Sequence, residues 1–379
     1  MSKKVLFIIS LFFTYFSSSQ ESVNLQLKNL TPPNSPAFVL MDITPTNITI
    51  PENIQAFSIQ TLNSFTGNSN NGVSPNNYAI EFQPYWYGKR IGMNFFKYNN
   101  LTSEKDKEDK EVDDYNGYNP FGDIWKKASF SVAFMNGTFD IFDSPQSYLS
   151  IGGRTRLFSY IDQKQIERIK SSYKAYRDFA TSIEYINIKQ QVADGDITND
   201  EGEEKIRNIE NGVIENLNKT IQRKPIFAID VAMAYSHFVG DKSQNLSDNF
   251  GRFGLWVLGD LALNLNSINK SHYFHIYGVF RYLEDGLNRD DDNNLFTKSD
   301  YDYGAKFEIE LNALSLGYEY IKRDNSTDES RSFGTIRYRI SNSLTLNGGF
   351  GKNFKSDSSL TTILGIQWGL DFGSSVSAK

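Results

Sequence analysis

Charged residues occupy one face of three predicted strands near the C-terminal end of the sequence. Successive side chains of a β-strand point to opposite faces, so each stretch would carry its charges on one face. Folding the stretches about their turns sets Lys306 opposite Glu319, and Glu319 opposite Arg337. Opposite charges at facing positions stabilise a sheet. The set comprises Lys306, Glu308, Glu310, Glu319, Arg337 and Arg339.

Two kinds of chemistry suit such a face. If it were enclosed, the charges would satisfy one another away from water, where an unpaired charge is costly, and would form a structural network. If it lined a pore, the same residues would form a constriction that selects small polar or ionic solutes. The sequence leaves both interpretations open.

Catalytic and metal-binding residues are sparse. The chain has no cysteine, which excludes disulfides, thiolate metal sites and cysteine nucleophiles. The acidic stretches 284–292 and 194–201 do not have the spacing of a twelve-residue calcium loop. Of three histidines, His237 lies on an apolar strand face, but no GxSxG motif accompanies it. We therefore predict no cofactor, no metal site and no enzymatic activity, and a membrane-embedded lipid hydrolase is the least favoured alternative.

The stretch from Leu360 to Phe372 is a two-faced strand. Its apolar residues alternate with small or polar ones, which is typical of a barrel strand that faces lipid. The apolar face that we single out consists of Leu364, Ile366, Trp368, Leu370 and Phe372.

The same alternation recurs along the chain and predicts an all-β fold. We expect an antiparallel transmembrane β-barrel of about 12 strands over 55–372, because an even strand number is usual for bacterial barrels. A net charge of -6 argues against nucleic acid as a partner. The candidate strands are 55–63, 77–87, 124–135, 147–160, 225–238, 252–265, 272–284, 301–311, 314–322, 331–341, 343–353 and 360–372.

A helical hairpin is predicted at 161–224, between two of these strands. Apolar residues recur there at three- and four-residue steps, and Thr198 and Glu201 fit a capping box for its second helix. The short turns near 312 and 342 indicate that this side is periplasmic, since such barrels have short periplasmic turns. The hairpin is either a self-packed structural insertion or a docking arm for an envelope protein partner.

The N-terminal segment contains two further predicted units. Residues 1–19 have two lysines, an apolar run and small residues, which indicates a cleaved signal peptide and export to the outer membrane. Residues 20–54 hold five of the ten prolines, so we expect an extended segment. It is either a linker or a periplasmic strap that packs across the mouth of the barrel.

Three segments resemble an uncharacterised outer-membrane barrel family of Bacteroidota-type bacteria. They are 35–38, 78–86 and the closing strand. The closing strand with its terminal aromatic is similar to those that the barrel-assembly machinery recognises. The resemblance implies location and fold, with outer-membrane lipid as a partner, and it implies no activity. A soluble β-sandwich exported to the periplasm is the rival fold.

The functional hypotheses follow from these elements. The first is an integral outer-membrane barrel that is structural or forms a narrow channel for small polar solutes. The alternative is a subunit of an outer-membrane assembly that docks partners through 161–224.

Overall fold

The computed structural model describes most of the chain outside its two ends. Residues 1–19 of the predicted signal peptide and Phe372 of the closing strand lie outside the described residues. The described residues are 24–25, 34–46, 57–66, 77–86, 95–103, 111–137, 146–221, 223–239, 249–265, 272–290, 294–324, 329–341, 343–354, 360–370 and 376–377.

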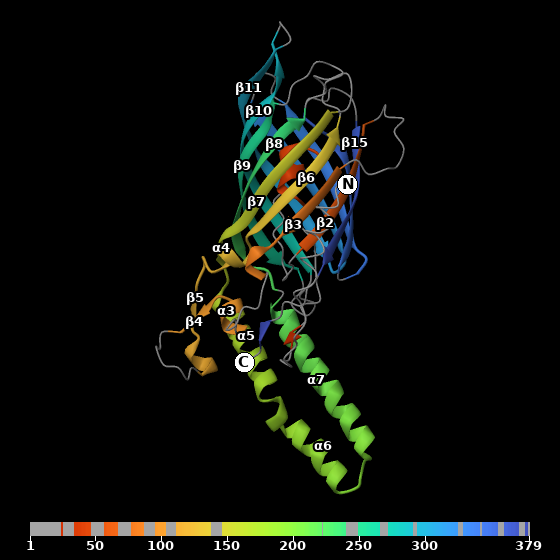
Figure 1. The fold of residues 1–379 in the computed structure, drawn as a ribbon. Helices are drawn as coiled ribbons and strands as arrows, with labels where there is room; N and C mark the ends of the chain where they lie inside the picture. The colour runs from red at the N-terminus through yellow and green to blue at the C-terminus, as the bar shows by residue number, and fades with distance from the viewer. Residues whose placement is uncertain are drawn as a thin grey trace, which may run out of the picture.

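Twelve antiparallel strands form a closed barrel, which confirms the predicted fold class (Figure 1). The chain runs around the wall from neighbour to neighbour, and β15 closes the barrel against β2 through the pairing of Trp368 with Ile59. The strands of the wall are β2 (Phe57–Thr66), β3 (Asn77–Phe82), β6 (Ser129–Gly137), β7 (Gln146–Tyr160), β8 (Phe227–Val239), β9 (Asn249–Asn264), β10 (His272–Arg289), β11 (Leu295–Leu311), β12 (Leu314–Asp324), β13 (Ser330–Arg339), β14 (Leu344–Lys352) and β15 (Leu360–Leu370).

The predicted strands 77–87 and 124–135 overlap observed ones but extend too far. The first ends at Phe82 and is followed by the single turn η1 (Pro84–Trp86). The second begins only at Ser129, because residues Asp123–Lys126 form the short helix α4. The predicted strand boundaries are wrong where the chain leaves the barrel wall, because hydrogen bonds to a neighbouring strand no longer keep the backbone extended there.

The outer surface of the wall is apolar, as the alternation predicts. On β15, the side chains of Leu364, Ile366 and Trp368 are 52%, 46% and 53% exposed, while Ile363 and Gln367 between them are buried. Strand β3 and each wall strand from β6 to β15 contribute at least one exposed large apolar side chain. Examples around the wall are Ile80, Phe134, Ile151, Met233, Leu255, Phe280, Phe307, Tyr318, Ile336 and Phe350.

The helical hairpin is confirmed and stands at one end of the barrel (Figure 1). Its first arm is broken into α5 (Gln163–Arg177), the turn η3 (Phe179–Thr181) and α6 (Ile183–Ala193), because Ser182 caps a new helix by accepting a hydrogen bond from the Tyr185 amide. The second arm is α7 (Asn199–Ile221), which packs against both α5 and α6. The predicted capping box is present: the Glu201 amide donates to the Thr198 hydroxyl, and the Thr198 amide donates to the Glu201 carboxylate. No described helix has the length and apolar composition needed to cross a membrane.

A second core joins this hairpin to the connection between β3 and β6. That connection contains α3 (Phe95–Tyr98), β4 (Leu101–Thr102), η2 (Val112–Asp114), β5 (Gly117–Tyr118) and α4. The ring of Phe95 stacks on that of Tyr173 of α5 with 5.0 Å between the ring centroids, and the ring of Phe96 stacks on that of Tyr115 with 4.0 Å between the centroids. We call this set the joint core. Its buried members are Phe95, Phe96, Leu101, Val112, Ile166, Ile169, Tyr173 and Leu217.

A buried lysine holds the two ends of that connection together. The Lys126 ammonium, on α4, donates to the carbonyls of Lys97 and Tyr98 at the C-terminal end of α3. Burial lowers the pKa of Lys126, and the nearby Asp123 carboxylate offsets part of that effect. Burial would raise the pKa of Asp123, but Lys126 and other cations outweigh it and the pKa is lowered. The Lys126 Nζ lies 3.4 Å from the Asp123 carboxylate, and this ion pair anchors the insertion to the barrel.

Residues 34–46 lie inside the barrel, and we call them the luminal plug (Figure 1). The plug contains the short helix α2 (Pro36–Leu40), in which Ser35 is the N-cap and Pro36 takes the first position. Phe38 and Leu40 are 0% exposed and pack among wall residues such as Trp256. The proline-rich segment was expected as a linker or a strap across the barrel mouth. The structure differs for residues 34–46, because their apolar side chains are buried in the lumen itself.

Two wall glycines make room for the plug. A Cβ atom at Gly152 would lie 2.9 Å from Pro36, and one at Gly254 would lie 2.8 Å from Leu40. Distances this short would force the plug away from the wall. Small residues on inward positions thus admit a helix into a lumen that larger side chains would fill.

The ends of the described chain also meet. The two-residue strands β1 (Asn24–Leu25) and β16 (Val376–Ser377) pair antiparallel with each other, and β16 contacts α3.

Candidate functional site

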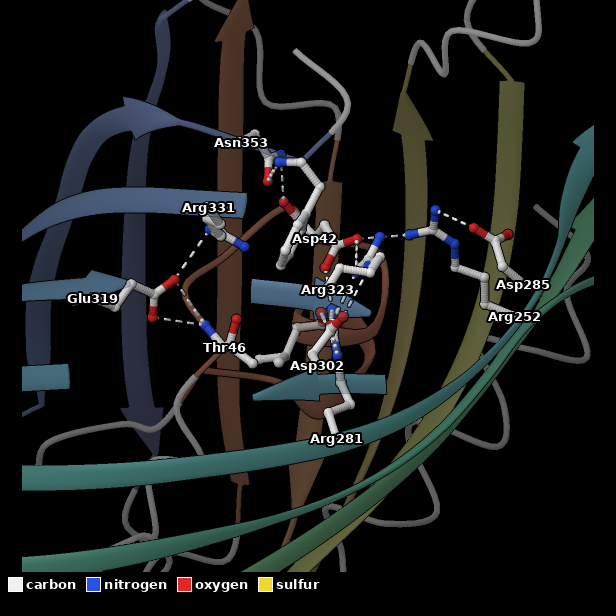
Figure 2. A network of polar contacts seen from close by, with 12 residues as sticks. Asp42, Thr46, Arg252, Arg281, Asp285, Asp302, Glu319, Arg323, Arg331 and Asn353 are labelled. Atoms are coloured by element: carbon white, nitrogen blue, oxygen red, sulfur yellow. Dashed lines mark hydrogen bonds and ion pairs between the residues drawn. The ribbon is translucent and has the colours of Figure 1, made fainter. Parts of the chain in front are cut away.

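The lumen is charged, and its most connected residue comes from the plug. The Asp42 carboxylate accepts hydrogen bonds from Arg281 at 2.6 Å, Arg252 at 3.0 Å and Arg323 at 3.1 Å (Figure 2). These arginines, which we call the three-arginine cluster, project from β10, β9 and β12. Their side chains are at most 5% exposed. Charge-assisted bonds of this kind are roughly twice as strong as neutral ones.

Two wall carboxylates hold the same arginines from the other side. Asp302 accepts from Nε of Arg281 at 2.8 Å and from Nε of Arg323 at 2.7 Å. Asp285 accepts from Arg252 at 2.7 Å. Each guanidinium therefore has a partner within the wall as well as one on the plug.

The plug is also held through its backbone. Arg281 donates to the carbonyl of Val39 at 2.9 Å, and the Asn353 side chain donates to the carbonyl of Asp42 at 3.1 Å. Further along the plug, the Thr46 amide donates to the Glu319 carboxylate at 3.1 Å. Glu319 is paired in turn with Arg331, whose Nε lies 3.1 Å away (Figure 2).

Four of the six charged residues singled out from the sequence form one group closer to the helical end of the barrel. Lys306 donates to Glu308 at 2.5 Å, and Arg337 donates to Glu308 at 2.8 Å. Glu310 lies 3.9 Å from Arg337 and is paired with Lys224 at 2.6 Å. We call Lys306, Glu308 and Arg337 the Glu308 group.

The other two predicted residues are placed differently. Glu319 lies opposite Lys306, as predicted. The predicted pairing of Glu319 with Arg337 was wrong, because Glu319 lies opposite Phe333 and Arg337 lies opposite Ser315. Glu319 therefore pairs with Arg331 instead. Arg339 donates to the carbonyl of Asn312 at the barrel rim, and no ion pair is recorded for it among the described residues.

A small cavity separates the plug from the wall beside the Glu308 group. Its volume is about 50 Å³, and its walls include Thr44 and Pro45 of the plug. Asn347 and Gln367 also line it, and the Nδ2 of Asn347 and the Oε1 of Gln367 have no hydrogen-bond partner within the described part of the chain. A buried water needs roughly 10–15 Å³ and several polar partners, so this cavity has room for a few waters.

Most of the lumen network was not predicted from the sequence, although part of its signal was present. Arg281, Asp302 and Arg323 are buried at inward positions of strands whose alternation was recognised. Asp302 and Arg323 belong to the same inward face as the predicted residues of 301–341, and Arg281 belongs to that of the predicted strand 272–284. The same holds for Arg154 of β7, which pairs with Glu81 of β3. Asp42 had no such signal, because nothing local to a proline-rich segment predicts that it enters a barrel.

The residues considered for catalysis are not assembled into a site. His237 lies on the outer face of β8, opposite Leu149 on β7 and Phe250 on β9, so neither cross-strand neighbour is a nucleophile or a carboxylate. His275 is inside the lumen, where its Nδ1 lies 2.8 Å from Asp260. Within the described ranges, no group of three or more histidines and carboxylates is arranged to hold a metal ion.

Comparison with known proteins gives a likeness to barrels only. No family model matches the sequence, and no curated protein matches it either. Among solved structures, the chain is similar to the KdgM porin in complex with disordered oligogalacturonate, at 8% identity and a TM-score of 0.34, over 83% of this chain and 99% of that chain. It is also similar to a NanC porin, at 6% identity and a TM-score of 0.34, over 83% of this chain and 100% of that chain. A third similar structure is the Acinetobacter baumannii outer membrane protein Omp33, at 10% identity and a TM-score of 0.31, over 83% of this chain and 98% of that chain. At these identities and TM-scores the comparisons say nothing about the lumen, which is described from this chain's own residues.

Proposed function

We propose that this chain is an integral outer-membrane β-barrel whose lumen is a narrow channel for small polar solutes, closed in this conformation by the luminal plug. The observation that carries the proposal is the polar cavity between plug and wall, which is lined by the Glu308 group. A lumen with a purely structural role would be expected to satisfy its buried amides, as buried polar groups normally are. Here Asn347 and Gln367 each retain one buried polar atom that has no hydrogen-bond partner among the residues that the structure describes.

The outer surface supports membrane insertion. Large exposed apolar side chains surround the barrel, and contiguous patches of this size are unusual on a soluble monomer. Outer-membrane lipid is the partner that such a surface fits. Export by a cleaved signal peptide at 1–19, recognition of Leu370 and Phe372 by the barrel-assembly machinery, and the resemblance to a Bacteroidota-type family remain predictions of the sequence. We also expect no enzymatic activity, since the cross-strand neighbours of His237 are Leu149 and Phe250.

The size of the cavity limits what can pass. With room for only a few waters, it admits water or a small ion, and larger polar solutes require the plug to move. The Glu308 group would then act as a constriction in which charge, rather than diameter alone, selects the solute.

Single-channel recording tests this proposal. The mature chain is refolded, a heat-shift gel confirms a barrel, and the protein is inserted into a planar bilayer. We expect discrete conductance whose cation preference falls severalfold in Glu308→Gln, because that change leaves Lys306 and Arg337 without their shared carboxylate. Glu284→Gln is the matched control, since Glu284 lies outside the lumen and accepts a hydrogen bond from Tyr282.

Electrical silence would contradict the channel. If the folded wild type and a folded variant lacking residues 34–46 both conduct nothing, the barrel is a structural envelope protein. A conductance that Glu308→Gln and Glu284→Gln change equally would remove the Glu308 group from the pathway.

A second candidate function is that of a subunit that docks an envelope protein through 161–224. Helix α6, which lies in the part of the hairpin far from the barrel (Figure 1), leaves Ile183 77% exposed and Ile186 54% exposed. A partner that co-purifies with the wild type and is lost from Ile183→Ser/Ile186→Ser, while the barrel still folds, would support this role. Unchanged co-purification would count against it.

A further inference from the structure

The three-arginine cluster surrounds a carboxylate that is not part of the wall. Asp42 enters from the plug and meets guanidiniums from three different strands. The arginines bring three positive charges, and Asp285 and Asp302 supply two negative ones, so the wall alone carries one unbalanced positive charge. Asp42 neutralises that charge.

The wall holds the cluster in place independently of Asp42. Asp302 bridges Arg281 and Arg323, and Asp285 binds Arg252, so the donors that face Asp42 are positioned by bonds within the barrel. Donors that are already held in place lose little conformational entropy when a ligand binds, and such preorganisation favours a recognition site. Arginine is suited to carboxylates because its planar fork donates in a fixed geometry.

The backbone of Asp42 ends helix α2 and turns the chain toward the cluster. Its φ is +57°, the left-handed conformation common at the residue that follows a helix C-cap. The Asp42 amide donates to the Val39 carbonyl, and the Ile43 amide donates to the Phe38 carbonyl. The Asn353 side chain donates to the Asp42 carbonyl and holds this turn against the wall.

We infer that the three-arginine cluster is a binding site for a small monocarboxylate in the lumen, and that Asp42 occupies it as an internal ligand. The inference rests on the proposed function, since a solute reaches the cluster only through a lumen that can open. The tether gives Asp42 an effective concentration in the millimolar range or higher, so a free carboxylate competes only when it is abundant or when the plug is displaced. Binding of the solute and seating of the plug are therefore mutually exclusive.

Chemical rescue tests the site. Acetate is the side chain of aspartate plus one hydrogen, so it fits the space that Asp42→Gly leaves, and glycine tolerates the left-handed backbone. We expect Asp42→Gly to lower the midpoint of thermal unfolding in detergent, and about 100 mM acetate to restore at least half of that loss by binding the folded state. Acetamide, which is neutral, and sodium chloride at the same ionic strength should restore little.

Two further variants complete the design. Asp42→Asn keeps the size and backbone preference but removes the charge, and it serves if Asp42→Gly does not fold. It should also be rescued by acetate, to a smaller extent, because its amide partly occupies the site. Asp324→Asn removes one carboxylate from the exposed side of β12, next to Arg323, and should show no rescue.

The outcomes separate this site from the channel. Equal effects of acetate, acetamide and chloride on both Asp42 variants would overturn the carboxylate site, even if the protein conducts. Rescue by acetate together with a silent bilayer in wild type and variants would uphold the site and reject the channel. Rescue together with anion-selective conductance in Asp42→Gly is the result that we expect.

Discussion

At the scale of single residues, one buried charge of the lumen, on Arg331, has few partners among the described residues. Arg331 is fully buried, and among the residues that the structure describes it forms an ion pair with Glu319 alone. Its Nη1 and Nη2 donate to no other described residue. Removing one member of a buried pair leaves the other charge uncompensated, which costs far more than the pair itself contributes.

We therefore expect Glu319→Gln to destabilise the barrel by about 3–5 kcal/mol. The double variant Glu319→Gln/Arg331→Met should recover most of that loss, because no unpaired guanidinium remains. Urea unfolding in lipid vesicles, followed by tryptophan fluorescence, measures both. A double variant no more stable than Glu319→Gln would show that Arg331 is not the source of the cost.

The residue scale also shows what the sequence could predict. The inward face that Lys306 and Glu308 share followed from alternation alone, and the turn near 312 placed Lys306 opposite Glu319, as observed. The pairing of Glu319 with Arg337 did not hold, because the observed neighbour is Phe333, four residues earlier. A register shift by an even number of residues keeps every side chain on the same face, so the apolar pattern cannot detect it.

At the scale of elements, the hairpin depends on the joint core rather than on its own two arms alone. Phe95 is 0% exposed and contacts both Phe96 and Tyr173, so it joins the connection between β3 and β6 to α5. Sequence periodicity predicted the two arms, because each has an apolar stripe. Periodicity could not predict that residues of the connection between β3 and β6 complete the core, since that connection and the hairpin are far apart in the sequence and meet only in the folded chain.

We expect Phe95→Ala to remove about 3–5 kcal/mol from the joint core. The hairpin should then become sensitive to limited proteolysis within α5 and α7, while the heat-shift of the barrel stays unchanged. Phe179→Ala is the matched control, because Phe179 lies on η3 and contacts Tyr185 of α6 outside the joint core. Equal sensitivity of both variants would mean that the hairpin is held by its own arms.

At the scale of the whole molecule, aromatic side chains extend the apolar surface past the strand ends. Trp125 of α4 is 73% exposed, and Phe121 beside it lies 5.7 Å from Phe158 on β7. Tryptophan at the edge of an apolar band is typical of the membrane interface. α4 therefore marks the level at which the barrel would leave the membrane and the joint core would begin.

The absence of cysteine in the chain allows this level to be measured with one spin label at a time. We expect a label at Trp368→Cys to be far more accessible to oxygen than to a water-soluble nickel complex, because β15 would face hydrocarbon. The label at Trp125→Cys should be intermediate, and the label at Ile183→Cys should favour the nickel complex, since α6 would stand in water. This order distinguishes a membrane barrel from the exported soluble rival, in which all three labels would face water and report alike. If Trp368 is lipid-exposed but Trp125 matches Ile183, the barrel spans the membrane and the apolar band ends at the strands instead of at α4.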